Sequence, residues 1–84
     1  MIKLVEVHKN LTGYHLGEVY INPKHVVAMR QDDRMLSVLR EGKLPGGLDE
    51  NQRFTKLYVD RGQSGIDITV VGELNHIKEK LGIN

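Results

Sequence analysis

The fold is decided by residues 66–81, which read IDITVVGELNHIKEKL. The first part of this stretch alternates between apolar and polar side chains, and its inward-facing members are Ile66, Ile68 and Val70. That period of two residues predicts a strand with one buried face. From Glu73 the period changes, and the large apolar residues fall at i, i+3 and i+7: Leu74, Ile77 and Leu81. This spacing predicts a short helix, which must pack on a sheet because so short a helix is not stable by itself.

Upstream of this stretch, further short segments are typical of strands. They are rich in β-branched and aromatic residues and cover 2–7, 18–21, 25–30, 35–40 and 54–60. The polar residues 31–34 predict a turn that makes a hairpin of the segments on either side. We therefore predict an α+β fold: a curled antiparallel sheet, or a small partly open β-barrel, of about six short strands with one C-terminal helix.

The length and composition predict one small folded domain spanning residues 1–84. Residues 41–53 are polar and glycine-rich and predict a flexible surface loop. The chain is 39% hydrophobic and 27% charged, which argues against intrinsic disorder. A domain of this size has a thin core, and unpaired sheet edges favour association, so a homo-oligomer is compatible with the sequence.

The charge pattern and the lack of long apolar runs limit where in the cell the protein is expected and which classes of partner it is expected to bind. The formal net charge is +1, with no strongly polarised third, so electrostatics nominate neither nucleic acid nor an anionic membrane as partner. No segment reads as a signal peptide or as a membrane-spanning helix, and there is no cysteine. These features predict a soluble, cytoplasmic protein without a membrane partner.

The residue types that perform catalysis do not form a recognised pattern. The histidines His8, His15, His25 and His76 lack metal-ligand spacing, although two of them could meet across neighbouring strands. Asp60 and Asp67 flank one predicted hairpin without an apolar pocket to shift a pKa. Ser64 lies in a glycine-containing turn followed by a strand, not by the helix that a nucleophile elbow requires. We predict no enzyme activity, no cofactor and no metal site.

Two features are candidates for partner binding. The first is the apolar pair Leu44 and Leu48, which lie in the polar surface loop where a partner could contact them. The second is the strand face that carries Phe54, Lys56 and Tyr58. On an exposed sheet, this face could stack bases and neutralise a phosphate, helped by Arg30 and Arg53; otherwise the aromatics pack in the core or at a protein interface.

Three stretches resemble a known family. They are Met1-Ile2-Lys3-Leu4, then Tyr20-Ile21-Asn22-Pro23-Lys24-His25-Val26, and finally Ile68-Thr69-Val70-Val71 with the helix after it. Together they cover under half the chain and are similar to short proteins of the flagellar FlbD/SwrD group, which lack the additional residues at 8–17 and around 41–53. The resemblance implies a non-enzymatic regulatory protein acting through protein contacts, and a bacterial or phage accessory protein is equally compatible.

Two functions follow as hypotheses. The first is a small non-enzymatic binding or regulatory module that engages a protein through a sheet edge, the 41–53 loop or the face of Phe54 and Tyr58. The alternative is a single-stranded nucleic-acid-binding β domain that uses Phe54, Lys56 and Tyr58.

Overall fold

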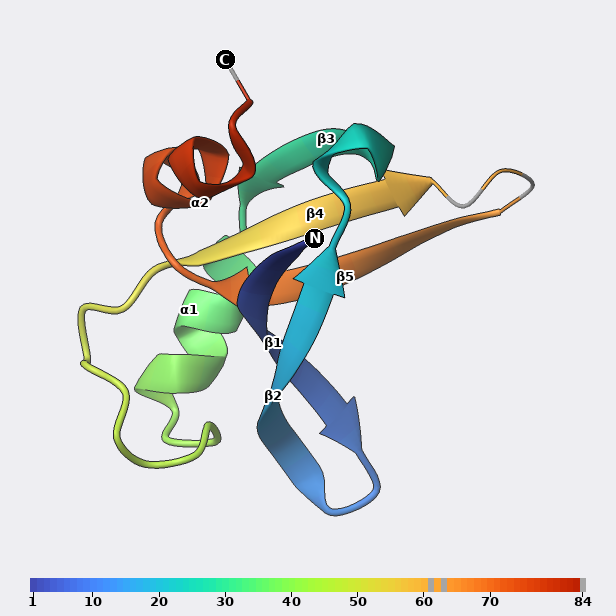
Figure 1. The fold of residues 1–84 in the computed structure, drawn as a ribbon. Coiled ribbons are helices and arrows are strands. Elements are labelled where there is room, and N and C mark those ends of the chain that lie inside the picture. The colour runs from blue at the N-terminus through green and yellow to red at the C-terminus, as the bar shows by residue number, and fades with distance from the viewer. Residues whose placement is uncertain (61, 63, 84) are drawn as a thin grey trace.

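A computed structural model describes residues 1–60, 62 and 64–83 (Figure 1). In chain order its elements are β1 (Ile2–Asn10), β2 (Gly13–Ile21), the 3-10 helix η1 (Pro23–His25), β3 (Val26–Gln31), α1 (Asp33–Arg40), β4 (Phe54–Asp60), β5 (Gly65–Val71) and α2 (Leu74–Leu81). No helix in these described ranges is long and apolar enough to cross a membrane.

The strands form one antiparallel five-stranded sheet in the order β2-β1-β5-β4-β3, which confirms the predicted class but not the predicted number of strands. In a flat sheet, the edge strands β2 and β3 would be separated by four inter-strand distances of about 4.8 Å, which is roughly 19 Å in total. Only Asn22 and the 3-10 turn η1 join these strands, and that turn rises only about 2 Å per residue. The sheet must therefore curl, as Figure 1 shows, and it stays open between β2 and β3.

Residues 35–40 were predicted as a strand, and this prediction is wrong because they belong to α1. The Asp32 carboxylate caps this helix, since its Oδ1 accepts a hydrogen bond of 3.0 Å from the backbone N–H of Met35. Met35, Val38 and Leu39 then share one helical face and pack against a buried cluster. With α1 formed, the predicted hairpin of 25–40 does not exist, and β3 pairs with β4 instead.

The first two strands are longer than predicted and form a hairpin. β1 continues to Asn10 and β2 begins at Gly13, so the turn contains only Leu11 and Thr12. The Asn10 side chain accepts a hydrogen bond of 2.8 Å from the backbone N–H of Thr12, which closes the turn. Residues 8–10 and 13–17, which lie outside the strands predicted at 2–7 and 18–21, therefore belong to β1 and β2.

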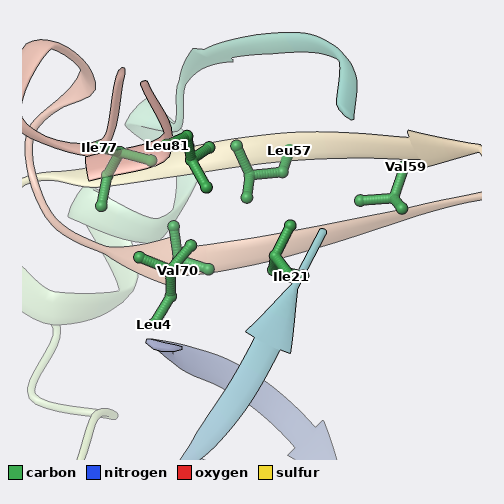
Figure 2. Packing of buried hydrophobic residues seen from close by; sticks show 7 residues of the cluster. All are labelled: Leu4, Ile21, Leu57, Val59, Val70, Ile77 and Leu81. Carbon is green, nitrogen blue, oxygen red and sulfur yellow. The ribbon is translucent and has the colours of Figure 1, made fainter. Parts of the chain in front are cut away.

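The concave face of the sheet holds the larger of two cores, drawn in Figure 2. Its buried members come from β1, β2, β4, β5 and α2 and are Leu4, Ile21, Leu57, Val59, Val70, Ile77 and Leu81. Ile77 and Leu81 belong to the predicted stripe of α2, which is confirmed. The helix ends at Gly82, whose φ of 69° is left-handed, a conformation typical of glycine at the C-terminal end of a helix.

A second core lies on the other face, beneath α1 and the segment 41–53. Its buried members are Val7, Leu44 and Phe54, with Leu48 partly buried beside them. The segment 41–53 contains no helix or strand. Its leucines nevertheless pack on the sheet, so the small domain covers both faces of its central strands.

Candidate binding site

Three of the five predicted contact residues belong to the second core. Phe54 is 1% exposed and Leu44 is 9% exposed, while Leu48 is partly buried against them. The prediction that the polar loop presents Leu44 and Leu48 to a partner is therefore corrected, because both leucines pack on the sheet. Phe54 lies beneath them and α1, which is the core packing that the sequence left open for this residue. The three apolar side chains pack in the core because a domain this small has few large apolar residues, including one phenylalanine, with which to build a core.

Lys56 and Tyr58 remain accessible on the uncovered part of the same strand face. Arg30 of β3 pairs in register with Lys56, and its guanidinium carbon lies 5.6 Å from the centroid of the Tyr58 ring. With Arg34 of α1, these residues border a shallow hollow of about 170 Å³. The negative charge of Asp67 faces Tyr58 from β5.

Arg53 does not join this group. Its guanidinium Nη1 donates a hydrogen bond of 3.1 Å to the backbone carbonyl of Asn51, within the segment that precedes β4. The basic surface therefore contains Arg30, Arg34 and Lys56 around one aromatic ring, not the two aromatic rings that the sequence predicted.

A larger cleft of about 360 Å³ opens on the concave side of the sheet, between β2, η1 and the β4–β5 hairpin. Its apolar wall is formed by residues whose strands place them on the core face: Val19, Ile21, Val59, Ile66 and Ile68. Figure 2 shows why it lies here: Ile77 and Leu81 of α2 fill one end of the row of core side chains, and Val59 stands at the other. The cleft is thus the end of the curled sheet that α2 does not cover.

Two local contacts hold the rim of the cleft. The Asn22 side-chain oxygen accepts a hydrogen bond of 3.0 Å from the backbone N–H of Lys24 and so caps η1. The ring of His25 donates from Nδ1 to the carbonyl oxygen of Asp60 at 3.0 Å, because a carbonyl can only accept. This second bond fixes η1 to the end of β4 at the rim of the cleft.

Exposed apolar side chains gather around this cleft. Met1 and Ile66 line it and are 83% and 40% exposed, while Tyr20 lies between two inward-facing residues of β2 and contributes to the rim through its position on that strand. Ile66 also borders a neighbouring hollow of about 400 Å³, together with the exposed Val27. Single exposed apolar residues are ordinary on protein surfaces, but a group of them around one concavity is typical of an interaction site.

Of the chemically reactive groups that the sequence singled out, His8, His15 and Asp67 lie apart from the cleft, whereas Asp60 lines it. His8 and His15 face each other across the first hairpin, with ring centroids 5.8 Å apart, so these two histidines do meet across strands. Asp60 lies opposite Gly65, and Asp67 opposite Tyr58, so these two carboxylates are not cross-strand neighbours. In the predicted turn of 61–65, residues 61 and 63 lie outside the described residues.

A charge pair in the segment 41–53 is also remote from the cleft. The Glu41 carboxylate lies 3.0 Å from the ammonium group of Lys43. It raises the pKa of Lys43 through a hydrogen bond and through charge attraction. Both side chains are exposed, so the pair is well solvated and contributes little to stability.

The sequence did not identify the cleft, because its lining comes from four segments that only the curl of the sheet brings together. One signal was present: Glu6 is a charged residue in line with the inward-facing Ile2 and Leu4 of β1. No family model, curated protein or solved structure matches the chain, so the evidence on function comes from its own surface.

Proposed function

We propose that this domain is a non-enzymatic module that binds a protein partner, and that an apolar side chain of the partner occupies the cleft between β2, β4 and β5. The observation that carries the proposal is the apolar cleft itself, with Met1 and Ile66 exposed around it. Contact with a partner would remove these groups from water, which is favourable by about 25 cal/mol per Å² of apolar surface.

The position of β2 supports the same mode of binding. β2 is an edge strand and forms one side of the cleft, so one of its backbone edges has no strand partner in the sheet. An extended segment of a partner can add to such an edge and place alternate side chains toward the concavity. One aliphatic side chain contributes about 1.5–3 kcal/mol when fully buried, and backbone pairing adds to this. A regulatory role, as the resemblance to the FlbD/SwrD group implies, would be exercised through this contact.

A matched pair of substitutions tests the proposal. Ile66 and Val5 are almost equally exposed, at 40% and 39%, but Ile66 lines the cleft and Val5 does not. A library of displayed random peptides is selected on the full chain, and the affinities of enriched peptides are measured by fluorescence anisotropy. We expect Ile66→Lys to weaken binding at least about tenfold, equivalent to about 1.4 kcal/mol, and Val5→Lys to leave it unchanged.

Two results would contradict the proposal. One is the failure of the library to yield any peptide that binds the folded domain better than an unrelated domain. The other is equal loss of affinity in Ile66→Lys and Val5→Lys. Far-UV circular dichroism of both variants separates loss of binding from loss of fold.

A second candidate function rests on the stacking of Arg30 on Tyr58. This pair, with Lys56 and Arg34 around the smaller hollow, offers one aromatic face and three cations to a single-stranded nucleic acid. It predicts salt-dependent binding of oligonucleotides that Tyr58→Ala weakens and Tyr20→Ala does not. The absence of any anisotropy change with oligonucleotides at low salt would exclude this function.

A further inference from the structure

Glu6 introduces a charge into the wall of the cleft. It pairs in register with Gly17 of β2 and with Val70 of β5, and Val70 is fully buried in the core of the concave face. Directly opposite residues of antiparallel strands point to the same side of the sheet. Glu6 is therefore half-buried on the concave side, where it lines the cleft beside aliphatic residues.

The cleft has an excess of negative charge. Glu6 and Asp60 both line it, whereas its described lining includes no lysine or arginine and, among formal cations, only the α-amino group of Met1. Salt bridges within the described ranges are Lys3–Glu18 and Lys43–Glu41, so neither acidic group of the cleft takes part in one. Asp60 accepts a hydrogen bond of 2.8 Å from the backbone N–H of Gly62, and the ring of His25 is bonded to the carbonyl of Asp60, not to either carboxylate.

From this arrangement we infer that the cleft selects a basic side chain, lysine or arginine, in the protein segment that it binds. Lysine and arginine have aliphatic stems that pack on apolar surface and a charged head that keeps polar contacts. The stem would lie along Val19 and Ile68, and the head would reach the Glu6 carboxylate. A carboxylate beside apolar walls attracts a cation more strongly than one surrounded by water, because the local dielectric constant is lower.

This inference rests on the proposed function, since it adds a basic side chain of the partner beside the apolar side chain that the same cleft receives. It predicts that peptides enriched on the chain contain a lysine or arginine next to an apolar residue. It also predicts that replacing that basic residue by norleucine, which keeps the stem and removes the charge, weakens binding about tenfold. Glu6→Gln should produce a similar loss on the protein side, because glutamine preserves the shape of the side chain.

A double-mutant cycle measures whether the two charges contact each other. If they do, norleucine costs little further affinity once Glu6→Gln is present, and the two changes are not additive. Glu18→Gln is the matched control, because Glu18 lies on β2 with its exposed side chain paired to Lys3 outside the cleft. It removes the same charge from the protein and should leave the affinity unchanged.

The outcomes separate this inference from the proposed function. If norleucine and Glu6→Gln leave binding intact while Ile66→Lys abolishes it, the cleft binds apolar side chains without charge selection and the inference is wrong. If Ile66→Lys has no effect either, the proposed function fails with it. The norleucine arm uses the unaltered protein, so the inference is tested even if Glu6→Gln were to destabilise the fold.

Discussion

At the scale of single residues, a buried polar contact joins α1 to the sheet. The hydroxyl of Thr69 donates a hydrogen bond of 2.7 Å to Oδ2 of Asp32, whose other oxygen caps the helix. Thr69→Val keeps the shape but leaves a buried charged acceptor without its donor, and we expect the free energy of unfolding to fall by about 1–3 kcal/mol. Urea denaturation measures this, and an unchanged midpoint would show that the contact contributes nothing.

Gly72 is the second residue with a specific structural role. Its φ is 140°, and a β-carbon at this position would lie 2.6 Å from Cδ1 of the buried Ile77. We expect Gly72→Ala to lower the free energy of unfolding by about 1–3 kcal/mol, through backbone strain and displacement of Ile77. Gly46→Ala is the control, because its β-carbon would meet nothing within 4 Å. Equal stability of both variants in thermal denaturation would refute this role.

At the scale of elements, α2 contributes to stability through its packing, not through its length. Ile77 is 1% exposed in the core of the concave face, and Ile77→Ala should cost about 2–5 kcal/mol in the free energy of unfolding. Lys78→Ala changes the next residue on the exposed side and should cost less than about 0.5 kcal/mol. Chemical denaturation of both variants tests this, and similar losses would mean that α2 is not docked by its apolar stripe.

The elements also show what the sequence could and could not predict. The strand of 66–71 and the helix after it were correctly predicted because their apolar periods differ clearly and their ends carry turn residues. The segment 35–40 was misassigned because its short apolar run fits either period. The signal that distinguishes a helix from a strand here is Asp32, which precedes Met35 at the spacing of a helix cap.

At the scale of the whole molecule, the curl of the sheet creates the cleft. Val19, Ile66 and Glu6 are distant in sequence and share the cleft only because η1 brings the ends of β2 and β3 toward each other. Periodicity indicates which face of a strand is apolar, but it does not show where a helix leaves that face uncovered. Phe54 and Leu44 illustrate the converse, since residues that read as a binding surface are covered by α1 and its following segment.

The central claim is that the uncovered end of the curled sheet is the partner site. The most direct measurement is a titration of the ¹⁵N-labelled chain with an enriched peptide, followed by amide chemical shifts. We predict that the largest changes fall on Val19, Ile66 and Ile68, with small changes around Lys56 and Tyr58. Largest changes on the face of Lys56 and Tyr58, or on α1, would contradict the claim and place the binding surface on the opposite side of the sheet.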